Sequence, residues 1–288
     1  MAEPTVWVAV KPVAPVLDVD WLAGTVRTDQ RHLVRSPADA AACAVAASVA
    51  GHLGVAYGVV AVGGPAVTEV LRTAVAEGAS SAVRLAVGED RDDVSLGSQW
   101  PSAVVAAALA EVVAGAAIVV CGDASLDRGS GTVPGLLAGV LGVAQVLGAR
   151  TVEVEGTTLV ATRRLDGGRR ERVRVAAPCV LSVEAGAGAP ERAALEEVLA
   201  SVSPGAPVEV RLVTAPPGAA RGDAPGTRVG PYRARPSDLA PPVATDPVRR
   251  AIEVAGTLQR RDAPEVLRAE PEQAATTILD RLARWGLR

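Results

Sequence analysis

Short apolar runs, each followed by a segment with helical periodicity, constrain the fold of this chain more than any other feature. Residues 55–62 and 116–121 are almost entirely apolar, and residues 5–10 and 81–87 are similar. Strands that are apolar on both faces are typical of parallel sheets covered by helices. The segments with helical periodicity are 36–50, 66–77, 101–114 and 132–141. This order predicts an α/β fold with a mostly parallel sheet flanked by helices.

After Gly148 the periodicity changes, and apolar and polar residues alternate. The alternating runs are 151–156, 157–165, 169–177 and 179–183. Such alternation is typical of antiparallel strands, and Asp166-Gly167-Gly168 predicts a hairpin turn between the second and third runs. We therefore expect an antiparallel addition to the parallel sheet, with residues 179–183 as its last strand.

The composition shifts again near residue 203, because ten of the 21 prolines lie between Ser203 and Pro247. This pattern predicts an α/β domain over residues 1–202 and a Pro-rich arm over 203–288. The arm ends in a helix at about 271–285 with an apolar stripe. The stripe needs a surface to cover it, which belongs either to the chain's own body or to a partner that the arm contacts.

Charge and residue usage exclude several classes of protein. The 29 basic and 32 acidic residues leave a net charge of −3, which argues against nucleic-acid binding. Residues 40–66 are uncharged but rich in Ala and Gly, so we expect a helix, a turn and a strand there and no membrane insertion. Three separated cysteines, two histidines and an N-terminus without a signal pattern predict a cytoplasmic chain with no metal site.

The segment most informative about chemistry is residues 121–142, where a buried strand leads into a glycine-rich loop and a helix. Glycines allow close backbone approach, and the free N–H groups of a helix start suit a phosphate. A generic glycine-rich turn explains the same spacing. No nucleophile–base motif, P-loop or GxGxxG is present, so we expect no catalytic side chains. The predicted strands ending near Ala9, Gly63 and Gly122 would line one crevice.

Several longer segments resemble one known family. The opening VWVAVKPV resembles a VKRVPD-like first strand, and VGGPAVTEVLRTAVAEGASSAVRL resembles a segment of the type GP…LRTALAMGAD. SPADAAACAVAA is similar to an NPF-type helix start, and CGDASLDRGSGTVPGLLAGVLGVAQV to a G-x-Q-A-x-D-x-D-x-x-Q-x-G loop and helix. These are features of the β subunit of electron transfer flavoproteins, and the likeness covers roughly residues 5–200.

The resemblance implies a Rossmann-like, adenine-nucleotide-binding domain in a non-enzymatic electron carrier. In that family the β subunit pairs with an α subunit, shares its FAD, and binds AMP or a second FAD. Dehydrogenases donate electrons, which pass to a downstream acceptor. The positions that match the family's nucleotide site are Ala9, Ser36, Pro37, Ala38, Asp39, Gly63, Gly122, Asp123, Ala124, Ser125, Leu126, Asp127, Arg128, Gly129, Ser130, Gly131, Thr132 and Val133.

The loop departs from the family pattern at several positions. Ser36 replaces the Asn of NPF, Ala124 and Thr132 replace Gln residues, and Gly129 replaces the second Asp. Backbone N–H groups still suit a phosphate, whereas base and ribose contacts lose side chains, so an AMP-binding site and an empty one both remain open. The divergence and the Pro-rich arm resemble homologues associated with mycofactocin redox systems.

A second reading places the chain in another class. It would be a stand-alone adenine-nucleotide-binding protein of the same α/β type, such as a stress protein or an ATP-using enzyme. The loop DRGSGT at 127–132 would grip the phosphates. ATP hydrolysis or adenylation by the isolated chain would distinguish this reading from the carrier.

Overall fold

The computed structural model describes residues 5–16, 18–20, 25–27, 29–87, 100–203, 206, 208–213, 241–255, 266 and 268–284. The chain divides into two compact units, Met1–Pro231 and Tyr232–Arg288. The first unit contains the sheet and the candidate site. The second contains helices α6 (Pro247–Val254) and α7 (Pro271–Arg284).

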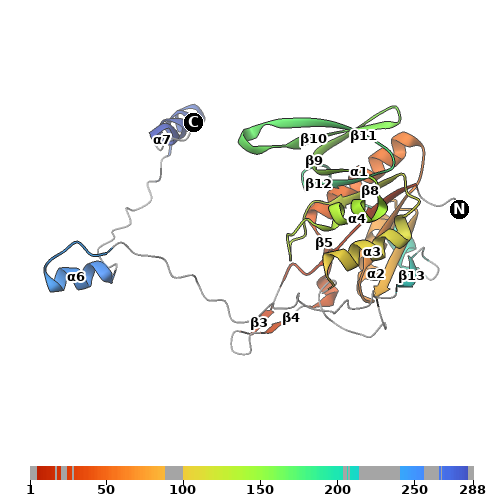
Figure 1. Ribbon diagram of the computed structural model, residues 1–288, viewed down its shortest axis with the longest axis horizontal. Helices are drawn as coiled ribbons and strands as arrows, with labels where there is room; N and C mark the ends of the chain where they lie inside the picture. The colour runs from red at the N-terminus through yellow and green to blue at the C-terminus, as the bar shows by residue number, and fades with distance from the viewer. Residues whose placement is uncertain are drawn as a thin grey trace. The chain divides into compact units, whose positions relative to one another are not determined.

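A nine-stranded mixed sheet forms the centre of the first unit, in the order β11-β10-β9-β12-β8-β1-β6-β7-β13 (Figure 1). The strands are β1 (Val6–Ala9), β6 (Tyr57–Val62), β7 (Ser81–Val87), β8 (Ile118–Gly122), β9 (Ala144–Glu155), β10 (Thr158–Arg164), β11 (Arg170–Ala176), β12 (Cys179–Val183) and β13 (Val208–Val213). Among the described strand pairs of this sheet, only β9–β10 and β10–β11 are antiparallel. The predicted α/β fold with a mostly parallel sheet is confirmed.

Helices cover both faces of this sheet. Helices α1 (Pro37–Leu53) and α2 (Val67–Ala76) pack on one face, and α3 (Ser102–Val113) and α4 (Val133–Leu141) on the other. Successive side chains of strand β1 point to opposite faces of the sheet, and both faces are apolar. Val6 and Val8 belong to the core under α1 and α2, and Trp7 and Ala9 belong to the core on the opposite face. Helix α5 (Leu195–Val202) lies against α2.

Smaller elements complete the described residues. Two-stranded sheets pair β2 (Pro12–Val13) with β5 (Val34–Arg35) and β3 (Asp18–Asp20) with β4 (Thr25–Arg27). Short 3-10 turns span Gln30–His32 and Asp166–Gly168. None of the helices in the described ranges is long and apolar enough to span a membrane.

Helix α1 begins where the sequence predicts. The Ser36 hydroxyl accepts a hydrogen bond from the backbone N–H of Asp39 at 3.2 Å, and Pro37 occupies the first turn. The helix ends at Gly54, which is left-handed with φ of 66°. Residues 40–66 therefore form a helix, a turn and the buried strand β6, as expected.

Strand β12 corrects one prediction. Residues 179–183 are expected in the antiparallel addition, but β12 lies between β8 and β9 and pairs parallel with both. All five of its residues are buried, which matches a central strand. Strand β9 begins at Ala144, ahead of the expected Gly148, so its start pairs with β12 and its end with β10.

The Pro-rich region contains elements that the sequence does not predict. The domain boundary after residue 202 stays a prediction. Strand β13 lies beyond that boundary and pairs parallel with β7. The predicted C-terminal helix is present as α7, while α6 is not predicted. Residues 214–240 and Trp285 lie outside the described residues, and the partner contact of the arm stays a prediction.

Candidate functional site

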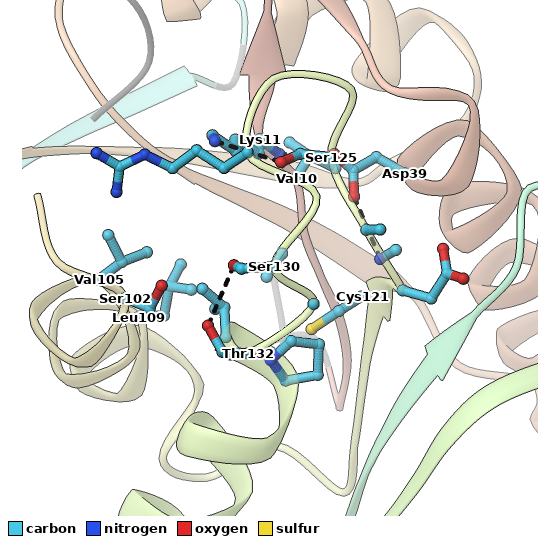
Figure 2. A pocket seen from close by; sticks show the side chains of 18 of the residues that line it. Val10, Lys11, Asp39, Ser102, Val105, Leu109, Cys121, Ser125, Ser130 and Thr132 are labelled. Carbon is cyan, nitrogen blue, oxygen red and sulfur yellow. Dashed lines mark hydrogen bonds between the residues drawn. The ribbon is translucent and has the colours of Figure 1, made fainter. Parts of the chain in front are cut away.

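A pocket lies at the carboxyl ends of β1, β6 and β8, bounded on its other side by α3 and the start of α4 (Figure 2). It encloses about 760 Å³, including space open to solvent. Its lining consists of Ala9, Val10, Lys11, Asp39, Val62, Trp100, Ser102, Val105, Leu109, Cys121, Gly122, Asp123, Ala124, Ser125, Arg128, Ser130, Gly131, Thr132, Val133 and Pro134. The pocket occupies the edge at which open α/β sheets bind ligands.

The buried carboxylate of Asp39 joins three elements at this edge. Its oxygens accept hydrogen bonds from the backbone N–H groups of Lys11 at 2.8 Å and Gly122 at 3.2 Å. The start of α1 is thereby fixed to the ends of β1 and β8. Burial raises the pKa of Asp39 to about 6, and the hydrogen bonds from Lys11, Ser36 and Gly122 oppose part of that rise.

Glycine is required at two positions of the adjoining loop. A Cβ at Gly122 would lie 2.5 Å from an Asp39 carboxylate oxygen and 2.9 Å from the Ala38 carbonyl carbon. Gly131 has φ of 60°, and a Cβ there would lie 2.7 Å from the Asp123 carbonyl oxygen. Both glycines let the backbone pass closely, so the loop shape depends on them.

An ion pair fastens the loop to the end of β1. The Nζ of Lys11, the chain's only lysine, lies 2.6 and 2.7 Å from the two carboxylate oxygens of Asp127, and 3.4 Å from the Ser125 hydroxyl. Partial burial alone would raise the pKa of Asp127. Hydrogen bonds from Lys11 and Ser125 outweigh burial, so this pKa lies below its usual value.

The pocket has a polar side and an apolar side. Ser130 and Thr132 share a hydrogen bond of 3.2 Å between their hydroxyls, immediately before the first turn of α4. In Figure 2 these hydroxyls point toward each other, and Val105 and Leu109 of α3 stand nearby on the wall. The Arg128 guanidinium donates to the Trp100 carbonyl oxygen at 3.5 Å. A planar base suits the apolar side, and a phosphate suits the hydroxyls and the α4 N-terminus.

Two further groups shape the electrostatics of the lining. Burial raises the pKa of the Cys121 thiol to about 12, so this thiol stays protonated. Burial also raises the pKa of Asp123, and the Glu184 carboxylate adds to that rise. The described residues contain no cluster of His, Cys, Asp or Glu that could hold a metal ion.

Most of the sequence-predicted site residues meet in this pocket. Those in the lining are Ala9, Asp39, Gly122, Asp123, Ala124, Ser125, Arg128, Ser130, Gly131, Thr132 and Val133. Outside it lie Ser36, Pro37, Ala38, Gly63, Leu126, Asp127 and Gly129. Ser36 is fully buried as the α1 cap, and Asp127 acts on the pocket through Lys11.

Sequence reasoning missed the opposite wall. Trp100, Ser102, Val105 and Leu109 line the pocket from α3 and the residue pair before it. Lys11 has a local sequence signal, because it belongs to the strand end near Ala9 that is predicted to line the crevice, and it does line the pocket. The α3 residues have none beyond helical periodicity.

The lining fits an adenine nucleotide. One protein wall is apolar, the other carries hydroxyls at a helix start, and Arg128 brings positive charge to the same space, whereas the charge of Lys11 is paired with Asp127. Ala124 and Gly129 supply no polar side chain, so polar recognition falls to the hydroxyls and the backbone of the loop.

Comparisons with known proteins agree with this architecture. Residues 24–217 match the family described as electron transfer flavoprotein domain. An electron transfer flavoprotein subunit beta of Mycobacterium leprae (strain TN) is 35% identical over 102 residues, which make up 35% of this chain and 36% of that protein. The matched region spans about a third of the length of this relative.

Proposed function

The chain belongs to the electron transfer flavoprotein family, and we propose that it is the β subunit of such a flavoprotein. In this role it pairs with an FAD-binding α subunit and carries electrons from dehydrogenases to a downstream acceptor in the cytoplasm. The match over residues 24–217 carries the proposal. The similarity to a β subunit from Mycobacterium leprae supports the choice of subunit.

The proposed role is that of a carrier without catalytic side chains. When FAD is bound, the flavin supplies the electron-accepting and electron-donating chemistry. The chain's own residues would help to bind the flavin, to orient it and to shield it from solvent. The backbone framework that Asp39 fixes at the ends of β1 and β8 is suited to that task, because it is buried and held by two hydrogen bonds.

We propose that the pocket beside Asp39 binds AMP. The adenine would pack against the apolar side at Val105 and Leu109, and the phosphate would accept from the Ser130 and Thr132 hydroxyls and the start of α4. The Lys11–Asp127 ion pair holds the loop that carries these hydroxyls. Nucleotide binding here would therefore be structural and would not take part in electron transfer.

Release of bound nucleotide from the purified complex tests the proposal. The chain is co-expressed with a candidate α subunit, the complex is denatured, and the released nucleotides are separated and identified by absorbance. We expect about one FAD per heterodimer, with AMP as a second nucleotide. Release of FAD without AMP would agree with the carrier role and would refute the proposal that the pocket binds AMP.

The alternative hypothesis, a stand-alone adenine-nucleotide-binding protein, predicts a different result in the same experiment. The described pocket is built entirely from this chain, so a stand-alone adenine-nucleotide-binding protein would retain AMP or ATP without a partner. Adenine nucleotide on the isolated chain, with no complex and no flavin, would favour that reading over the carrier.

An ion-pair variant tests the site itself. Asp127→Ala removes the partner of Lys11 and frees the loop, so we expect lower nucleotide retention. The pair is partly exposed, so its loss should lower the free energy of unfolding by no more than about 1 kcal/mol. Arg72→Ala, which breaks an exposed ion pair with Glu69 on α2, is the matched control and should leave nucleotide content unchanged.

A further inference from the structure

The hairpin of β10 and β11 carries an unusual concentration of positive charge. Its turn spans Asp166–Gly168, and β11 is the edge strand of the large sheet. Figure 1 shows the hairpin standing clear of the helices that cover the rest of the sheet. Its arginines are Arg163, Arg164, Arg169, Arg170, Arg172 and Arg174, and its acids are Asp166 and Glu171.

Half of these arginines have carboxylate partners. Arg163 pairs with Glu171 across the hairpin. Arg172 and Arg174 reach over β10 to Glu153 and Glu155 of β9. These pairs form a ladder over the polar face of the antiparallel strands, with Val160 buried among them. These pairs link the side chains of β9, β10 and β11 and so support the antiparallel part of the sheet.

Among the described residues, the arginines next to the turn have no such partners. Arg164 lies directly opposite Arg170 in the strand register, and neither forms an ion pair with any described residue. Arg169 donates to the backbone carbonyl oxygen of Asp166, at 3.3 Å. All three are exposed. Like charges directly opposite each other destabilise a strand pair, so Arg164 and Arg170 do not serve the hairpin's own stability.

Protection of the sheet edge does not account for all three residues. Charged side chains on an edge strand discourage pairing with other chains. Arg170 lies on this edge strand, where Arg172 and Arg174 already place charge. Arg164 belongs to β10, an inner strand, so protection of the edge does not explain its charge.

We propose that Arg164, Arg169 and Arg170, here called the hairpin tip, form a docking site for a cluster of carboxylates on another protein. Guanidinium groups match carboxylates through paired N–H donors. The tip is small, and the chain's net charge of −3 opposes extended polyanions such as nucleic acid or an anionic membrane. A compact acidic patch on a partner avoids that repulsion. This proposal is independent of the nucleotide site and of flavin binding.

The test measures binding of an acidic peptide to the full-length chain. The probe is a fluorescein-labelled peptide of alternating Glu and Ser, and a Gln-Ser peptide is the neutral reference. We expect the Glu peptide to bind with an affinity that falls as salt rises. The double variant R164T/R170T should bind it at least about tenfold more weakly, since two charge-assisted contacts are lost. Arg192→Thr, an exposed arginine beside α5, should bind normally.

The melting temperature gives a second, independent readout. Because R164T/R170T removes a like-charge pair and Thr suits a strand, we expect a melting temperature equal to or above that of the wild type. Equal peptide binding by the wild type and the variant would overturn the proposal. A lower melting temperature of the variant would also overturn it, because the arginines would then serve the fold. Tighter binding of phosphatidylserine vesicles or inorganic polyphosphate than of the Glu peptide would assign the tip to phosphates instead.

Discussion

Replacing Asp39 by Asn should change how the stability of this protein depends on pH. The Asp39 carboxylate is 5% exposed and accepts two backbone hydrogen bonds. Burial raises its pKa from the ordinary 3.8 to about 6. Each tenfold change in proton affinity corresponds to about 1.4 kcal/mol, so this difference corresponds to about 3 kcal/mol.

The sign follows from linkage between proton binding and folding. Because the folded protein binds this proton more tightly than the unfolded chain, protonation of Asp39 favours the folded state. Its contribution to the free energy of unfolding is greatest below about pH 4, falls by about 3 kcal/mol as the pH rises to 6 and beyond, and then stays constant. The amide of the Asp39→Asn variant cannot titrate, so the variant lacks this contribution.

Denaturant unfolding of both proteins between pH 4 and 8, at constant ionic strength, measures the difference. The amide loses one of the two acceptor contacts, which costs about 1–3 kcal/mol at every pH. Relative to the wild type, the variant should gain about 2.4 kcal/mol between pH 4 and pH 7. Comparing the two proteins cancels the titration of all other groups. Parallel pH profiles would refute the assignment of this titration to Asp39.

Two further substitutions test the packing around the site. Gly122→Ala places a Cβ 2.5 Å from the Asp39 carboxylate, so we expect a loss of about 1–3 kcal/mol in unfolding free energy and lower nucleotide retention; Gly139→Ala in α4, where the Cβ meets nothing within 4 Å, should be neutral or stabilising. Glu77→Ala leaves the buried guanidinium of Arg35 without its carboxylate and should cost about 3–5 kcal/mol, measured by denaturant unfolding. The double replacement of this pair by Leu and Met should recover most of that loss.

Strand and helix positions in the parallel part of the sheet were predictable because their signal is local. Residues of β6 and β8 are buried on both faces, and an uninterrupted apolar run reports that environment directly. The start of α1 was equally predictable, since Ser36 and Pro37 act within one helical turn.

Strand direction was not predictable in the same way. Residues 179–183 follow three alternating runs and were therefore expected in the antiparallel addition, yet four of the five are apolar, all five are buried, and β12 pairs parallel with β8 and β9. The hydrophobic pattern records which residues are buried and carries no information about which neighbour they pair with. Strand β13 was missed for a related reason: its six residues lie within a Pro-rich region, and composition outweighed the alternation of VEVRLV.

The candidate site shows the same division between local and tertiary signals. The glycine-rich loop has a sequence signature, but what holds it in place comes from distant positions. Lys11 and Asp127 are 116 residues apart, and Asp39 and Gly122 are 83 apart. Two of the four residues that depart from the family pattern, Ala124 and Gly129, take part in neither contact. These two departures therefore change which groups the loop can offer to a ligand, while the contacts that hold the loop beside the pocket stay intact. Nucleotide retention should therefore respond more strongly to substitution of Asp39 or Asp127 than to substitution of Ala124 or Gly129.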